Sequence, residues 1–307
     1  MPNFTEVGLD LQATVKRIYQ NLIYRSSFYK MLNDSYIGEL RNTGTPMIEI
    51  IKTQDVTINV RNTKEIQTQL TPSLVGYDNV KVDLTELPMD YSIRIPILVT
   101  GSNIVNAIDS AMQKKDSAVA KKIDTYGFNK LATNENIVEK EWNPATKEEY
   151  IDLITKLSSD LFNNDVYDTY RMGLSATEYA KYVAALTSVL KYETMQGVEG
   201  VDRGTIARAY GVDAFQIADA VLGTAKGYFF NPMAVVGDAF FDAFVQHFSP
   251  QGYPGYYVFE GNVLFGAEVV EPKAIFRLVA QVSENTEGTE NTEGTENTEG
   301  TENTEGE

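Results

Sequence analysis

The sequence predicts an α+β fold, and three observations carry that prediction. Between residues 46 and 100 apolar residues alternate with polar ones at a period of two, which is typical of half-buried strands. After Gly101 the apolar period becomes that of a helix, and beyond residue 150 helical and strand patterns are interleaved. The chain has 307 residues, 43% of them apolar, so it is long enough to bury one large core or two ordinary ones.

Residues 1–45 predict an N-terminal arm. Leu11, Val15, Ile18 and Leu22 recur at spacings of four, three and four residues, which places them on one face of an amphipathic helix. The rest of the arm ends in a polar turn composition, and we expect it to lead into a sheet.

Residues 46–100 predict an extended β-hairpin followed by a further strand. The alternation over 56–60 and 80–84 predicts the two arms, with residues 62–79 as a polar tip, and the alternation over 93–99 predicts the third strand. An isolated two-stranded ribbon is only marginally stable in water. We therefore expect the hairpin to be covered by the body of its own chain or by a neighbouring subunit.

A long helix of about 23 residues is expected after Gly101. Its apolar positions share one face: Ile104, Ile108, Met112, Val119 and Ile123. Its charged positions are expected largely on the other faces: Lys114, Lys115, Asp116, Lys121 and Lys122. At 1.5 Å per residue such a helix is about 35 Å long, so it is either a core helix or a structural strut.

Mixed helices and strands are predicted from residue 146 onwards. Two capping boxes, Thr146 with Glu149 and Ser175 with Glu178, predict the starts of two helices. A third helix is expected over Ala234–Phe248. Strands are expected over or around 165–174, 206–210, 214–217 and 228–230, with a closing strand pair over 256–259 and 269–278.

The last 25 residues, 283–307, repeat the motif Glu-Asn-Thr-Glu-Gly-Thr and contain no apolar residue, so we expect a disordered acidic tail. Nine of the 43 acidic residues lie in this tail, which has no Lys or Arg, so the net charge of −17 divides into −9 there and −8 elsewhere. An acidic chain without a basic stripe in its sequence argues against tight binding to nucleic acid.

The composition excludes most familiar catalytic designs. There is no cysteine and one histidine, so thiol chemistry, thiolate metal sites and multi-histidine sites cannot be built within one chain. His247 is expected at the end of an apolar helix in a structural role, and Ser175 is expected to act as a helix cap. We assign no catalytic residue, no cofactor and no metal. No signal peptide and no membrane-spanning run is expected, so folding should be cytosolic.

One acidic pair keeps an enzymatic alternative open. Asp238 and Asp242 stand four residues apart, which on a helix would place both carboxylates on one face. We expect a solvated or ion-paired surface, while a carboxylate-dependent hydrolase needs only two such groups.

The order of these elements resembles a tailed-bacteriophage major capsid protein of the Hong Kong 97-like family. The segments that carry the resemblance are Phe28–Asn33 before the hairpin, Asp90–Ile95 before the long helix, and Val201–Val212 in the mixed region. The resemblance covers residues 1–282, and the acidic repeat departs from the family pattern.

The resemblance implies a domain division and a function. Residues 46–100 would be the E-loop, 101–149 with 255–282 the P-domain with its spine helix, and 150–254 the A-domain. The chain would form pentamers and hexamers of a non-covalent icosahedral shell in the virion, assembled in the host cytoplasm around double-stranded DNA without sequence-specific binding. Scaffolding, portal and decoration proteins are further expected partners. An encapsulin-like protein nanocompartment is the alternative within the same fold.

The same resemblance nominates contact residues between subunits. Basic side chains on or near the hairpin are expected to pair with acidic neighbours, and these are Lys52, Arg61, Lys64, Lys81 and Arg94. Exposed ion pairs of this kind each contribute about 0–1 kcal/mol.

Overall fold

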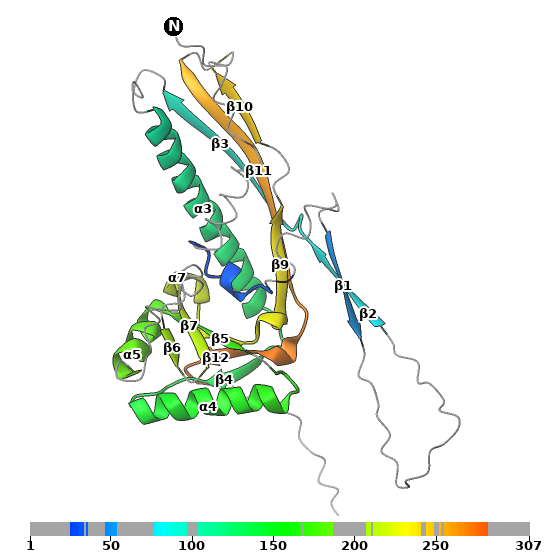
Figure 1. Ribbon diagram of the computed structural model, residues 1–307, viewed down its shortest axis with the longest axis vertical. Helices are drawn as coiled ribbons and strands as arrows, with labels where there is room; N and C mark the ends of the chain where they lie inside the picture. The colour runs from blue at the N-terminus through cyan, green and yellow to red at the C-terminus, as the bar shows by residue number, and fades with distance from the viewer. Residues whose placement is uncertain are drawn as a thin grey trace, which may run out of the picture.

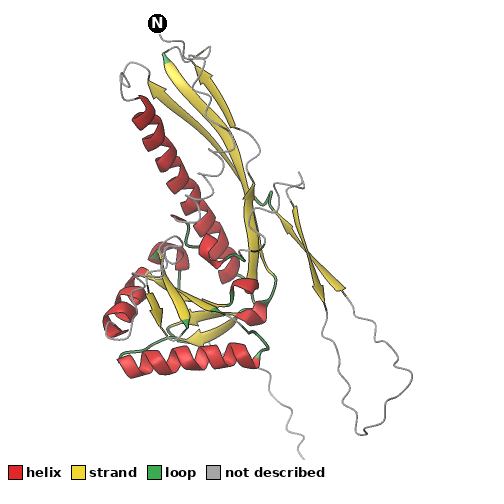
Figure 2. Cartoon of the chain, viewed as in Figure 1, coloured by secondary structure: helices red, strands yellow, loops and turns green. Residues whose placement is uncertain are grey.

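The computed structural model confirms a mixed fold of helices and sheets (Figure 1; Figure 2). The structure describes residues 25–33, 35, 47–53, 77–96, 104–167, 169–186, 207–209, 211–240, 244–248, 252 and 255–281. The predicted helix over 11–22, the predicted strand over 56–60 and the acidic tail lie outside these residues. No helix in the described ranges is long and apolar enough to cross a membrane.

A six-stranded sheet forms the lower body in Figure 1, in the order β4-β12-β8-β5-β7-β6. β4 pairs in parallel with β12 and β5 in parallel with β7, while the remaining neighbours are antiparallel. The strand bounds are β4 Val138–Glu141, β5 Tyr170–Ser175, β6 Ala207–Ala209, β7 Val212–Ile217, β8 Ala225–Phe230 and β12 Ile275–Val279.

Helices cover both faces of this sheet (Figure 1). The capping box predicted at Thr146 is present, and it starts α4 (Lys147–Asn163), which buries its apolar face against the core. Ser175 caps α5 (Ala176–Leu186) by accepting the backbone N–H of Glu178 at 3.2 Å. The short helix α7 is Asp219–Leu222, and the 3-10 turns are η2 Tyr29–Met31, η5 Pro232–Ala234 and η6 Pro272–Ala274.

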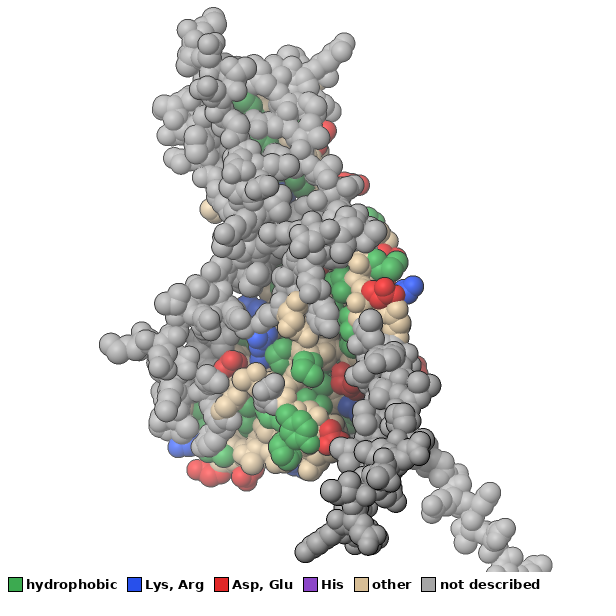
Figure 3. All heavy atoms as spheres, turned by 45° about the vertical axis from the view of Figure 1, so that its right-hand side comes forward, with side chains coloured by type: hydrophobic (Ala, Val, Ile, Leu, Met, Phe, Trp, Pro, Cys, Tyr) green, Lys and Arg blue, Asp and Glu red, His purple; other side chains and the backbone are tan. Residues whose placement is uncertain are grey.

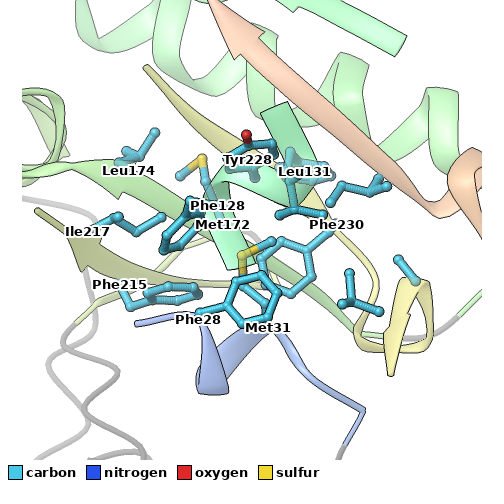
Figure 4. Packing of buried hydrophobic residues seen from close by; sticks show 14 of the residues in the cluster. Phe28, Met31, Phe128, Leu131, Met172, Leu174, Phe215, Ile217, Tyr228 and Phe230 are labelled. Atoms are coloured by element: carbon cyan, nitrogen blue, oxygen red, sulfur yellow. The ribbon is translucent and has the colours of Figure 1, made fainter. Parts of the chain in front are cut away.

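The long helix α3 spans Ile104–Ala132, 29 residues, and is longer than expected. Its last turns enter the main core, where the ring of Phe128 stacks on that of Tyr228 at 5.8 Å (Figure 4). The sequence predicted Lys115 and Asp116 on an exposed face of this helix, but both residues are buried. The Lys115 Nζ lies 3.1 Å from the Asp116 Oδ1. The Lys115 ammonium also lies 4.7 Å from the ring centre of Tyr91, which helps to offset the cost of its burial.

A second sheet extends beside α3 and is built around β11 (Tyr256–Val269). β11 pairs antiparallel with β3 (Leu87–Pro96) on one side. On its other side it pairs first with β10 (Phe244–Phe248) and then with β9 (Val235–Phe240). Two sequence predictions are therefore wrong. The segment Ala234–Phe248 contains strands β9 and β10 and is not a helix. The expected strand pair over 256–259 and 269–278 is also not formed, because β11 continues through Gly261 and Gly266 and does not pair with β12.

The misread helix has a physical explanation in its burial. Residues 235–239 of β9 are all buried, so both faces of the strand are in the interior and the apolar run shows no alternation. A continuous apolar run of this kind cannot be distinguished from a buried helix by its period.

The segment 25–33 is tied to α3 and β9. The Asp124 carboxylate on α3 accepts hydrogen bonds from the Ser26 hydroxyl at 2.6 Å and the Phe28 N–H at 2.9 Å. Burial raises the pKa of Asp124, although these hydrogen bonds and the charge of Lys30 oppose the shift. The Phe28 ring lies over Gly127, where an added Cβ would come within 2.4 Å of it. This part of the predicted arm therefore belongs to the core.

Candidate functional site

The β1–β2 hairpin, formed by β1 (Met47–Thr53) and β2 (Tyr77–Asp83), lies apart from the two larger sheets (Figure 1). Its strands are antiparallel, with Ile48 opposite Val82 and Ile50 opposite Val80. The predicted pairing of the two arms is wrong, because the strand opposite Val80–Val82 is 48–50, while residues 56–60 lie outside the described residues. The period of two in Ile48-Glu49-Ile50 was the signal for this arm, and the adjacent Ile51 obscured it.

One face of the hairpin is apolar and attached to the body. Ile48, Ile50, Val82 and Leu84 form a buried cluster with Val236 of β9. The hairpin packs closely against β11 at Gly266. A Cβ added to Gly266 would lie only 1.9 Å from the backbone oxygen of Asp83. The base of the hairpin therefore requires glycine at this point of β11.

The opposite face of the hairpin is polar and exposed. The Lys81 ammonium lies 3.9 Å from the Glu49 carboxylate directly across the strands, and the Lys81 side chain is 61% exposed. The Asn79 amide donates a hydrogen bond to the same carboxylate. This face therefore presents paired charges that can exchange partners at little cost.

A junction of three charged residues joins the hairpin to α3 and β11. The Lys130 ammonium lies 2.8 Å from Glu86, in the turn between β2 and β3, and 2.7 Å from Glu268 of β11. Tyr126 also donates a hydrogen bond to Glu86. Burial opposes the charge on Lys130, but its bonds to the two carboxylates outweigh that effect and raise its pKa. This junction fixes the turn from which the hairpin leaves the body, and the sequence analysis did not identify it.

The nominated contact residues fall in different places. Lys52 lies on β1 opposite Asp78, Lys81 on β2, and Arg94 on β3 opposite Val258. Arg61 and Lys64 lie outside the described residues. The hairpin thus brings Lys52 and Lys81 into one small sheet, while Arg94 belongs to the sheet beside α3.

An exposed hydrophobic patch lies at the end of α4, and the sequence analysis missed it. Phe162 is 57% exposed, Tyr167 53% and Met233 55%. The rings of Phe162 and Tyr167 meet edge to face at 5.0 Å, and the Asn231 amide ties η5 to the Tyr167 carbonyl at 3.0 Å. Hydrophobic side chains gather in the lower part of the face drawn in Figure 3.

The structure removes the geometry behind the enzymatic alternative. Asp238 lies on strand β9 and is fully buried, so it is not a solvated helix residue, and Asp242 lies outside the described residues. The Asp238 carboxylate accepts a hydrogen bond from the Tyr29 hydroxyl at 2.7 Å. His247 lies on strand β10, not at a helix end. In the described ranges there is no cluster of three or more His, Asp or Glu able to hold a metal.

The described elements are a long helix beside a sheet built on one long strand, a mixed sheet with helices on both faces, and a separate hairpin. The solved structures that match include phage capsids, and the chain shares their Hong Kong 97-like fold. One is a chain of Mycobacterium phage Che8, with 16% identity and a TM-score of 0.54, covering 82% of this chain and 90% of that one.

Two further structures support the same fold. The capsid of Ralstonia phage GP4 matches with 7% identity and a TM-score of 0.55, covering 80% of this chain and 86% of the other. The capsid of cyanophage P-SCSP1u matches with 13% identity and a TM-score of 0.52, covering 78% and 84%. No protein-family model and no curated protein sequence matches the chain. At these identities the likeness establishes the fold.

Proposed function

We propose that the chain is the major capsid protein of a tailed phage, which self-assembles into pentamers and hexamers of an icosahedral head enclosing double-stranded DNA. The observation that carries the proposal is the fold, which matches phage capsid structures over about four fifths of the chain and includes a hairpin that forms a sheet of its own. In the proposed virion the subunit needs no cofactor.

The hairpin supports self-association on physical grounds. Two strands gain little stability alone. In the described part of the hairpin, one apolar face packs on Val236 and Val270, and the opposite face is exposed. A neighbouring copy that packs on the exposed face would shield the hairpin from water and stabilise it. Lys52, Lys81 and Arg94, with Arg61 and Lys64, are the proposed partners for acidic groups of that copy.

The patch of Phe162, Tyr167 and Met233 is the second proposed contact surface. Aromatic residues and methionine are enriched in protein interfaces, whereas an isolated subunit gains nothing from exposing three such side chains together. In a closed ring each copy would present this patch to a different surface of the next copy.

Negative-stain electron microscopy of the purified chain, beside sedimentation velocity, tests the proposal. The expected result is closed or partial shells, or rings of five and six subunits. A small species that does not assemble at any salt concentration would contradict it. Particle contents then separate a DNA-filled head from the encapsulin-like alternative, which encloses protein. Scaffolding, portal and decoration proteins are sought by co-purification from the assembled particles.

A further inference from the structure

A stripe of four cations lies on the exposed side of α3, and we call it the α3 stripe. It consists of Lys114, Lys121 and Lys122 on the helix and Arg25 beside it, all of them exposed. Lys114 and Lys121 are seven residues apart, so they lie on the same face and about 10 Å apart along the axis. Arg25 joins them because its guanidinium donates to the Gln113 carbonyl at 2.7 Å and to the Ser117 hydroxyl.

The stripe is uncompensated within the part of the chain that the structure describes. No carboxylate lies within ion-pair distance of Lys114, Lys121 or Lys122 there, while Lys130 on the same helix has two carboxylate partners. Among the described side chains of α3, the neighbouring acids are already engaged. Asp116 is buried beside Lys115, and Asp124 holds the segment 26–28. Three lysines without a carboxylate partner in the described residues, with Arg25 beside them, favour an anionic partner in a chain of net charge −17.

The chemistry of the stripe favours a polyanion over a protein surface. The exposed residues between and next to its cations are small or polar, namely Ser117, Ala118 and Thr125. Protein interfaces have an apolar or aromatic centre and are depleted in lysine. Lysine acts as a point charge toward phosphate and reads no sequence.

Two polyanions are available, and charge density separates them. Double-stranded DNA carries one charge for about every 1.7 Å of its axis, with condensed counterions that are released on binding. The tail over 283–307 carries nine carboxylates in 25 residues. At about 3.3 Å per extended residue that is one charge for about every 9 Å. This charge density is far below that of DNA, so pairing the stripe with the tail would release fewer condensed counterions than pairing it with DNA.

We propose that the α3 stripe is the surface on which the subunit meets packaged double-stranded DNA, through sequence-independent contacts to phosphates. The inference rests on the proposed capsid function and extends it, because it turns this side of α3 toward the interior of the shell. Four cations per subunit, set in an acidic chain, hold DNA near the wall loosely.

The test measures binding of a fluorescent 30-base-pair DNA duplex to the full-length protein by anisotropy, over a series of salt concentrations. The variant K114Q/K121Q removes two stripe cations. The matched control K156Q/K273Q removes two exposed lysines on α4 and η6, which have no carboxylate within ion-pair distance in the described structure. Electron microscopy of each variant reports assembly separately.

We expect K114Q/K121Q to weaken binding about tenfold or more and to reduce the magnitude of the log–log salt slope by about 1.8, while the control stays within about twofold. Equal effects of the two variants would overturn the inference. So would an unassembled wild-type subunit that does not bind the duplex and yet goes on to form normal particles. If no variant forms particles, the proposed function fails as well.

A full-length variant with glutamine at the nine tail glutamates tests the competing occupant. We expect its dependence on Lys114 and Lys121 to match that of the wild type. If DNA binds only after the tail is neutralised, the tail occupies the stripe and the assignment to DNA is wrong.

Discussion

Tyr29 connects the segment 25–33 to β9 by side-chain hydrogen bonds. Its hydroxyl donates to the Asp238 carboxylate at 2.7 Å and accepts the Ala239 N–H at 2.8 Å, all within the buried core. A buried hydrogen-bonded group that loses its partner costs more than the net value of the bond, because desolvation is no longer compensated. We expect Tyr29→Phe to lower the free energy of unfolding by about 1–3 kcal/mol. Urea unfolding of the unassembled subunit measures this.

Tyr167→Phe is the matched control for Tyr29→Phe. The Tyr167 hydroxyl donates to Asp165 at 3.0 Å on the exposed surface, so its loss should change stability by less than about 0.5 kcal/mol. Equal losses in the two variants would show that the buried hydroxyl has no special role.

Gly127 offers a test in which two effects oppose each other. Alanine stabilises a helix interior by about 1 kcal/mol relative to glycine. Here its Cβ would come within 2.4 Å of the Phe28 ring, which is buried and meets Phe128 edge to face. Overpacking costs about 1–3 kcal/mol, so we expect Gly127→Ala to be destabilising. Thermal unfolding should show partial recovery in Gly127→Ala/Phe28→Leu, and additivity of the two changes would contradict the clash.

The exposure of the charged residues on α3 was predicted correctly for some of them and wrongly for others. The pattern placed Lys114, Lys121 and Lys122 on exposed faces, which the structure confirms. It placed Lys115 and Asp116 there too, because a run of charged residues is usually solvated. Their burial depends on Tyr91 of β3, which lies 24 residues before Lys115 in the chain and packs against its ammonium group. No local pattern contains that contact.

At the scale of elements, α5 begins with a cap supplied by another helix. The Asp219 carboxylate on α7 accepts the Thr177 hydroxyl at 2.7 Å and the Thr177 N–H at 3.3 Å. The bond from the Thr177 hydroxyl is the main cause that lowers the pKa of Asp219 from its ordinary value of 3.8. A carboxyl group with a lowered folded-state pKa stabilises the fold above its unfolded pKa, and this contribution is lost as the pH falls through the folded value.

We therefore expect Asp219→Asn to lower the Tm at pH 7, with the difference from wild type shrinking as the pH falls below about 4. Thermal unfolding from pH 7 to pH 3 measures it, with Asp152→Asn on the exposed side of α4 as the control. A difference that is constant with pH would mean that the charge of Asp219 does not cap α5.

The elements that were predicted correctly are those whose signals lie within a few neighbouring residues. The start of α4 was predicted because Thr146 and Glu149 satisfy each other within one turn, and the structure shows both bonds. β9 was misread because Val235 and Val236 are buried by partners distant in sequence, namely Leu32 and the hairpin. For Ser175 the predicted box is half present. Its hydroxyl caps the helix, while the Glu178 carboxylate binds Lys181 at 2.9 Å instead.

Closing the hairpin early tests its role as an element. Thr53 and Tyr77 are directly opposite each other, so replacing residues 54–76 by Asn-Gly should close β1 and β2 with a two-residue turn. The base keeps its contacts with Val236, so we expect an unfolding transition close to that of the wild type. Assembly should be lost or strongly reduced, as electron microscopy would show. Normal particles from this variant would remove the distal hairpin from the assembly mechanism.

At the scale of the whole molecule, truncation after Val282 is the counterpart of the hairpin variant. The truncation removes 25 residues, and the hairpin variant replaces 23. The 25 tail residues contain no apolar side chain that could anchor them to the folded body. We expect the truncated chain to fold and to form particles like those of the wild type. Loss of folding would contradict the expected disorder of the tail, and circular dichroism with electron microscopy separates folding from assembly.

The order of strands within the sheets could not be derived from the chain. β11 and β12 are close in sequence, yet they belong to different sheets, and β3 pairs with a strand more than 150 residues later. The candidate hairpin was predictable as a ribbon, but its junction at Lys130 was not. That junction depends on three segments converging on one ammonium group.

β11 also carries mechanical load through the molecule. Its early residues pair with β3 and β10 as far as Gly261, and its late residues pair with β9 from Leu264. Val263, Phe265 and Ala267 of the same strand are buried in the main core. A load applied to the far end of this sheet therefore reaches the main core along the backbone of β11.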